Sequence, residues 1–315
     1  MFLAWPAGEA ASSGRPRHRV GSSTRCAPWP VSPTVLGVEY LRSVAERSDP
    51  MGDPDIGEVD VCILGPVEVR GAARPFTRAW TVDLVVYLAL HRFGVSNEQW
   101  ATALWPDRLM AAPTLHSTVS AARRALGRSG GGTDHLPRQR GSLRLGPTVS
   151  TDWRRFQRLA DSTDPRDWRT GLSIVRGRPF AGLRSFDWPV LEGIEAEVTE
   201  TVVHLAVRLA DHLLARGDGR RAAQVARKGL VACPFDERLY RLILRAADAE
   251  GNPAGVEAAM SELLGLVSRD PGGSTPGALA IADEDCALVH PDTAALYWAL
   301  SRRLPAASGG SFARL

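Results

Sequence analysis

The sequence predicts two folded parts: an α+β domain of short strands and three helices, then an all-α domain of helical pairs. Three observations lead to this prediction. Short apolar runs separated by glycine and proline occupy residues 59–78. Three segments with helical periodicity follow, and from residue 187 onward the apolar residues recur almost entirely at helical spacing. We place the α+β domain at 57–150 and the helical domain at 151–303.

The two ends of the chain lack these patterns. Residues 1–56 are rich in Ala, Ser, Pro, Gly and Arg and show no sustained period, which predicts a disordered N-terminal extension. Met51 stands just before the first ordered pattern and is a candidate translation start. Residues 304–315 are predicted to be a loose tail.

Composition excludes several classes of protein. The chain has 315 residues, 44% hydrophobic and 23% charged, as is ordinary for a soluble globular protein, and its net charge of +3 identifies no partner. The four cysteines have neither zinc-site nor disulfide-framework spacing, so we expect reduced thiols in a cytoplasmic protein. No apolar run approaches the ~18–20 residues of a membrane span. Phosphate-loop, nucleophile-elbow and metal-cluster motifs are absent, so we expect no enzyme, cofactor or metal.

The first elements of the α+β domain are predicted as strands and two helices. "VDVCILGPVEVRG" and the later "RPFT" indicate three short antiparallel strands within residues 59–78. "WTVDLVVYLALHRFG" predicts a helix that ends at Gly94. "SNEQWATALWP" predicts a second helix, with Ser96 and Gln99 in a capping box.

"PTLHSTVSAARRALG", residues 113–127, predicts the third helix. A proline suits its first turn and Gly127 its C-terminal end. The apolar residues fall on one side at helical spacing and are predicted to face the core: Leu115, Val119, Ala122 and Leu126. The loop "SGGGTD" and a predicted hairpin over 136–146 follow. This order of elements is typical of a winged helix-turn-helix. In that motif the recognition helix, here residues 113–127, enters the DNA major groove.

The polar residues of this region are the candidate DNA contacts. Six arginines and a single acid, Asp134, lie between residues 113 and 145, which predicts a local positive patch suited to a phosphate backbone. The predicted contacts from the polar helix face are Thr114, His116, Ser117, Thr118 and Ser120. The predicted phosphate contacts are Arg123 and Arg124 on the helix, with Arg138 and Arg140 in the hairpin.

The helical domain shows an internal repeat. The turn Gly217-Asp218 recurs as Gly251-Asn252 at an offset of 34 residues. A helix-pair period of 34 is typical of tetratricopeptide repeats. The predicted core positions of the stacked helices are Leu205, Leu209, Leu230 and Leu242. "DTAALYWALSRR" predicts a closing helix after a loop over 271–290.

Several motifs together resemble those of the actinobacterial antibiotic-regulatory-protein family. They are "ILGPVEVRG", "ALWP", "TLHSTVSAARRALG", "VRGRPFAGL" and "ACPFDERLYRLILRAADAEGN", and the resemblance covers residues 59–303. Members of this family join an OmpR-type winged helix to a bacterial transcriptional activator domain of tetratricopeptide-like helices. The resemblance implies a transcriptional regulator, by expectation an activator. It would bind double-stranded DNA, contact RNA polymerase or a second copy of itself through the helical domain, and have no membrane partner.

The sequence departs from the family pattern at the predicted recognition helix. Ala121 and Ala122 stand where Arg and Leu are usual, and Arg140-Gly141-Ser142 stands where the hairpin usually carries "PGY". The departure leaves an alternative open. In it the helical domain is a protein-interaction scaffold, and the winged helix binds DNA weakly or without sequence specificity.

Overall fold

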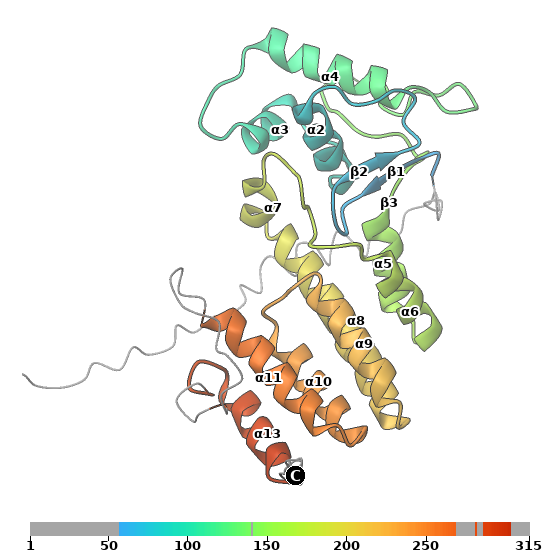
Figure 1. Cartoon of the computed structure of the whole chain (residues 1–315). Helices are drawn as coiled ribbons and strands as arrows, with labels where there is room; N and C mark the ends of the chain where they lie inside the picture. Colours follow the sequence, from blue (N-terminus) through green and yellow to red (C-terminus); the bar gives the residue numbers. More distant parts are fainter. Residues whose placement is uncertain (1–56, 140, 269–280, 282–285, 304–315) are drawn as a thin grey trace, which may run out of the picture. The chain divides into compact units, whose positions relative to one another are not determined.

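The computed structural model describes residues 57–139, 141–268, 281 and 286–303 (Figure 1). The predicted N-terminal extension, the tail and Arg140 lie outside the described residues. Within the described residues the two predicted domains belong to one compact unit, joined by contacts rather than separated by a linker.

The α+β domain contains a three-stranded sheet with the order β2-β1-β3. β1 (Val59–Cys62) pairs antiparallel with β2 (Glu68–Arg70) and parallel with β3 (Val149–Thr151). The prediction of three antiparallel strands within residues 59–78 is therefore wrong for the third strand. That strand comes from the far end of the domain, and its parallel pairing leaves no signal in local periodicity.

The segment predicted as the third strand closes the end of a helix instead. The N–H groups of Ala73 and Arg74 donate to the carbonyl oxygens of Leu126 and Ala125, at 3.3 and 3.0 Å. These carbonyls belong to the last turn of a helix and have no partner within it. Pro75 has no N–H to offer to a strand ladder.

Three helices form where they were predicted: α2 (Ala79–Leu90), α3 (Asn97–Leu104) and α4 (Ala112–Leu126). α2 ends at Leu90, before the predicted end at Gly94. The capping box of α3 is confirmed. Ser96 Oγ accepts the Gln99 N–H at 3.1 Å, and Gln99 Oε1 accepts the Ser96 N–H at 2.8 Å. α4 ends at Gly127, whose φ is +78° and where a Cβ would lie 2.5 Å from that of Ala73. Glycine is thus required there by both backbone conformation and space.

The hairpin predicted over 136–146 does not form in the described residues. Leu143 pairs with Val95, in the loop between α2 and α3, through two backbone hydrogen bonds of 2.7 and 2.9 Å. The segment before it lacks alternating apolar residues, and Pro137 has no N–H, so the chain has little with which to build a two-stranded ladder. The "SGGGTD" loop is a hydrogen-bonded turn in which the Ser129 N–H donates to the Thr133 carbonyl oxygen at 2.8 Å.

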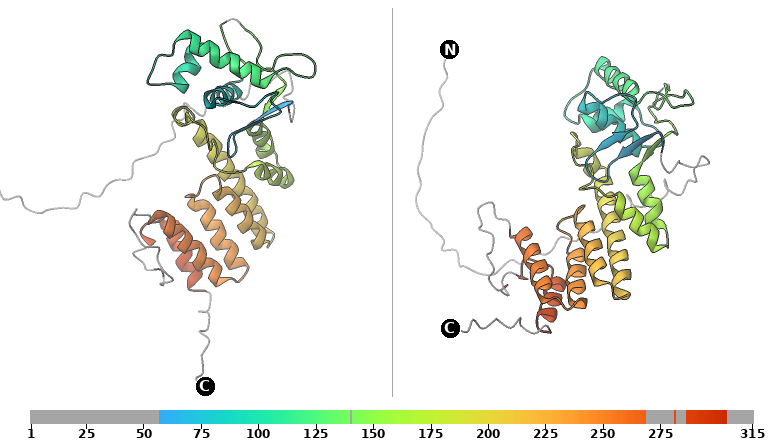
Figure 2. Two further views of the ribbon diagram at one scale, coloured as in Figure 1. Left: turned by 45° about the horizontal axis from the view of Figure 1, so that its top comes forward. Right: turned by 45° about the vertical axis from the view of Figure 1, so that its right-hand side comes forward.

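The second domain is helical throughout its described elements. Both views of Figure 2 show α8 to α11 and α13 lying side by side. The helices are α5 (Asp152–Asp161), α6 (Pro165–Ile174), α7 (Asp187–Leu191), α8 (Ile194–Ala215), α9 (Gly219–Leu230), α10 (Glu237–Ala249), α11 (Pro253–Val267) and α13 (Pro291–Ser301). The predicted closing helix is α13. Among the described residues, none of the helices combines the length and apolar character needed to cross a membrane.

The 34-residue repeat is confirmed in the turns between paired helices. Gly217 and Gly251 both have positive φ, +74° and +62°. The next residue in each turn, Asp218 or Asn252, accepts the N–H three residues further on, at 3.1 and 2.9 Å. The four leucines predicted as core are buried, and Leu209 is fully so. The helix pairs α8–α9 and α10–α11 therefore stack as repeated units around one core.

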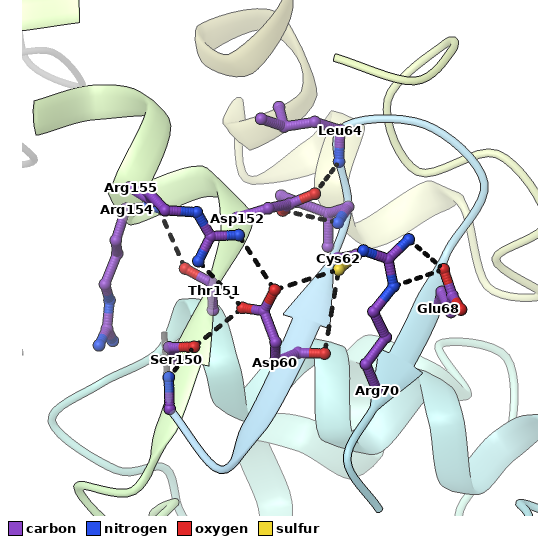
Figure 3. A network of polar contacts seen from close by, with 12 residues as sticks. Asp60, Cys62, Leu64, Glu68, Arg70, Ser150, Thr151, Asp152, Arg154 and Arg155 are labelled. Carbon is purple, nitrogen blue, oxygen red and sulfur yellow. Dashed lines mark hydrogen bonds and ion pairs between the residues drawn. The ribbon is translucent and has the colours of Figure 1, made fainter. Parts of the chain in front are cut away.

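The end of β1 is bound on both sides by residues from the helical domain. The Asp152 carboxylate accepts the N–H groups of Ile63 and Leu64 at 2.8 and 3.1 Å (Figure 3). The carbonyl oxygens of the same two residues accept the N–H groups of Phe180 and Arg176, at 2.9 and 2.6 Å. Every backbone polar group of this buried dipeptide is satisfied across the domain boundary, which fixes the sheet to the helical domain.

A second carboxylate holds α2 to the same domain. Asp83 is buried and accepts the backbone N–H groups of Ser185 and Arg184, at 2.8 and 3.4 Å. Burial raises the pKa of Asp83, although these hydrogen bonds favour the ionised carboxylate and act to lower it. Glu192 accepts from the Tyr87 hydroxyl at 3.2 Å, next to His91. These contacts fix the orientation of α2, against which α4 packs.

Candidate nucleic-acid interface

The exposed face of α4 carries a stripe of polar side chains at helical spacing. His116, Ser117, Ser120 and Arg124 are exposed, and Thr114 is half-buried at the edge of this stripe. Residues three and four apart on a helix are neighbours, so these side chains form one continuous surface. The Ser117 hydroxyl donates to the Thr114 carbonyl oxygen at 2.9 Å and still lies at the surface.

The buried face of α4 is rotated from the predicted one. Thr118, predicted on the DNA-facing side, is buried, with only 6% of its surface exposed, and its hydroxyl donates to the Thr114 carbonyl oxygen at 2.9 Å. Leu115, predicted in the core, is half-buried. The cause is that α2 and the segment around Ala73 cover the side of α4 that carries Thr118 and Ala125. Thr118 is therefore removed from the candidate contacts.

Arg123, predicted as a phosphate contact, holds the following segment to the helix instead. Its guanidinium is half-buried and donates to the carbonyl oxygens of Leu136 and Pro137, at 3.0 and 3.4 Å. Burial and, secondarily, the nearby charge of Arg138 lower the pKa of Arg123. Positive charge from α4 and from the segment after Leu136 thus lies close together.

Arg124 lies at a basic surface pocket that the sequence did not reveal. The pocket has a volume of about 260 Å³ and is lined by Arg74, Arg78 and Arg124, with Ala121 on its wall. None of its lining residues is acidic, and no described carboxylate pairs with these three arginines. Ala121, where the family pattern has Arg, leaves space beside α4, and arginines from the preceding segment supply the charge there.

The arginines after α4 differ in their surroundings. Arg138 and Arg144 are exposed and have no carboxylate partner among the described residues, whereas Arg128 pairs with Asp134 at 2.9 Å. Arg140 lies outside the described residues. Arg74, Arg78 and Arg124 thus line one basic pocket, and Arg138 and Arg144 are exposed positive charges on the segment after α4.

Arg74 and Arg78 were missed because their segment was predicted to be a strand of the sheet. The available signal was Gly127, since a helix that ends at a glycine leaves carbonyl groups for a nearby segment to cap. That capping places the 74–78 segment beside the last turns of α4. The described residues contain no group of three or more side chains suited to a metal ion.

Comparison with protein families decides the nature of the helical part. The family described as "Bacterial transcriptional activator domain" matches residues 151–270. This segment is similar to bacterial transcriptional activator domains, and we call it the activator domain. The match begins at Thr151, the side chain that caps α5, and covers both helix pairs of the repeat. The transcriptional activator domain of this chain therefore includes Asp152, which binds the end of β1.

A solved structure extends the similarity beyond the activator domain. Mycobacterium tuberculosis EmbR, in complex with a low-affinity phosphopeptide, aligns with a TM-score of 0.53 and 21% identity. The alignment covers 79% of this chain and 66% of the EmbR chain, so this chain spans somewhat less than two thirds of that structure. Comparison with curated protein sequences gives no significant match.

The similarity to EmbR and the order of elements establish the fold class. A small sheet with three helices precedes an all-helical repeat domain, as predicted for a winged helix followed by tetratricopeptide-like helices. The aligned 79% of the chain is more than residues 1–56 and 151–315 together contain, so it includes part of the winged-helix region. The family matched by residues 151–270 is described as a transcriptional activator domain, and EmbR shares the fold.

Proposed function

We propose that the chain is a DNA-binding transcriptional regulator in which the exposed face of α4 enters the major groove of duplex DNA. The observation that carries the proposal is the polar stripe of α4 next to arginines that have no described carboxylate partner. An α-helix fits the major groove, where short polar side chains and arginine can reach base edges.

The exposed side chains divide into two classes of contact. His116, Ser117 and Ser120 lie on the outermost face of α4 and would meet base edges. Arg74, Arg78 and Arg124 surround the basic pocket and would hold phosphates, together with Arg138. Arg123 would act indirectly by keeping the segment after α4 against the helix.

The activator domain would supply the second contact of a regulator. The binding partner of this domain would be RNA polymerase or a second copy of this chain. The solution mass of the chain, measured alone and with a bound duplex, distinguishes the two, since a second copy doubles the mass and polymerase contact does not.

Recovery of genomic fragments by the purified full chain tests DNA binding. We expect the sequenced fragments to share one motif, and we expect Arg124→Ala to recover less DNA of every sequence. Arg220→Ala is the matched control, because it removes the charge of an exposed arginine on α9. Uniform recovery of all fragments would favour the alternative of an interaction scaffold with a weak, nonspecific winged helix.

A further inference from the structure

The activator domain contains a pocket that DNA binding does not use. It lies between α6, α8 and α9 and has a volume of about 460 Å³. Pockets that hold small molecules have volumes of roughly 300–1,000 Å³. The lining residues are Arg169, Leu172, Ser173, Leu209, Leu213, Arg221, Gln224, Val225 and Lys228.

The floor of this pocket is apolar and fixed in position. Leu172, Leu209 and Leu213 come from two helices and are at least 94% buried, because they also belong to the core of the domain. Such side chains have little freedom to rearrange, so the floor presents a preformed apolar surface.

The rim of the pocket is cationic. All three charged residues in the lining are basic, and Lys228 is the single lysine of the chain. Lys228 is half-buried, Arg169 is exposed, and neither has an ion-pair partner among the described residues. Arg221 forms an ion pair of 3.2 Å with Asp218, a residue that does not line the pocket. Two cations without partners over an apolar floor form an environment that an anion would stabilise.

We propose that this pocket binds a small anionic amphiphile, a molecule with one carboxylate, sulfonate or phosphate group joined to an apolar body. Lys228 and Arg169 bind the anionic group, and the apolar body packs on the leucines of the floor. The volume suits a compact ligand of this kind. The ligand would contact α6, α8 and α9 together, so it would stabilise the packing of α6 on the first helix pair. This proposal does not depend on DNA binding by α4.

Two fluorescent probes of similar apolar body test the proposal. 1-Anilinonaphthalene-8-sulfonate is anionic, and N-phenyl-1-naphthylamine is its neutral counterpart. With the full chain we expect one sulfonate probe to bind per chain, about tenfold more tightly than the neutral probe, because a charge-assisted contact is added. Lys228→Gln should remove most of this difference, whereas Arg220→Gln, on the same helix but outside the lining, should leave it unchanged.

A labelled form of Lys228 locates the bound probe. Reductive methylation with ¹³C-formaldehyde keeps the positive charge and marks one lysine, whose signal is identified by its loss in Lys228→Gln. We expect the sulfonate probe to shift this signal with the same dissociation constant as the fluorescence. The proposal is overturned if the signal stays unmoved at saturating fluorescence, if Lys228→Gln binds like the wild type, or if no sulfonate probe binds.

Discussion

Replacing Asp152 by alanine removes the carboxylate that joins the activator domain to the sheet. This side chain is 1% exposed and accepts two backbone N–H groups at 2.8 and 3.1 Å. In Asp152→Ala both N–H groups stay buried with no acceptor. The nearby Arg176 guanidinium loses one of two carboxylate neighbours, since Asp152 lies at 3.6 Å and Glu68 at 3.7 Å.

The expected loss of stability follows from these two hydrogen bonds. An unsatisfied buried donor costs about 1–3 kcal/mol, so two donors correspond to roughly 2–6 kcal/mol in the free energy of unfolding. Burial raises the pKa of Asp152, although the Ile63 and Leu64 hydrogen bonds act to lower it. Removing this carboxylate therefore also removes the cost of its desolvation. We therefore expect the lower half of this range, about 2–4 kcal/mol. That is a fall of roughly 4–16 °C in melting temperature for a unit of this size.

Scanning calorimetry of the full chain measures this effect. Asp161→Ala is the matched control, because it removes an exposed carboxylate from the same helix and should change stability by less than about 0.5 kcal/mol. Asp152→Asn keeps one acceptor oxygen and should fall between the two. If Asp152→Ala melts within about 1 °C of the control, the carboxylate does not join the domains and the reasoning fails.

Three further outcomes are expected. Leu209→Asp places an unpaired charge at a fully buried position and should abolish cooperative melting of the activator domain, whereas an unchanged melting curve would show that its side chain is not in the core. Arg123→Ala should speed protease cleavage after Arg138 without altering the melting temperature greatly, and equal cleavage rates would refute its tethering role. Burial acts to raise the pKa of Asp60, but its hydrogen bonds with Arg155 and Ser150 outweigh burial and lower the pKa below 3.8. Its ionised form therefore adds stability that is lost as the pH falls below this value, and Asp60→Asn should flatten the acid limb of melting temperature against pH.

Local signals in the sequence predicted the helices of this chain well. The Ser96–Gln99 capping box, the glycine after α4 and the repeated turns at Gly217 and Gly251 depend on residues a few positions apart. Such contacts form within one turn of chain, so residue type and spacing are sufficient to identify them.

The errors arose where distant segments meet. β3 pairs with β1 from the far end of the domain, and the segment around Arg74 caps α4 instead of joining the sheet. The direction of α4's buried face depends on how α2 covers it, which turned Thr118 inward although its residue type suits a DNA contact. The arginines around the basic pocket were likewise separated in sequence, so periodicity could not bring them together.

The most direct test of DNA binding by α4 is the salt dependence of its affinity. The full chain, Arg124→Ala, Ser117→Ala and the Arg220→Ala control are titrated with a selected operator and with random duplex at several salt concentrations. We expect Arg124→Ala to weaken binding to both duplexes and to reduce the slope of log affinity against log salt by about one unit. Ser117→Ala should cost about 1–3 kcal/mol on the operator and leave random duplex unaffected. If both variants bind both duplexes as the control does, α4 does not enter the groove and the proposed function is wrong.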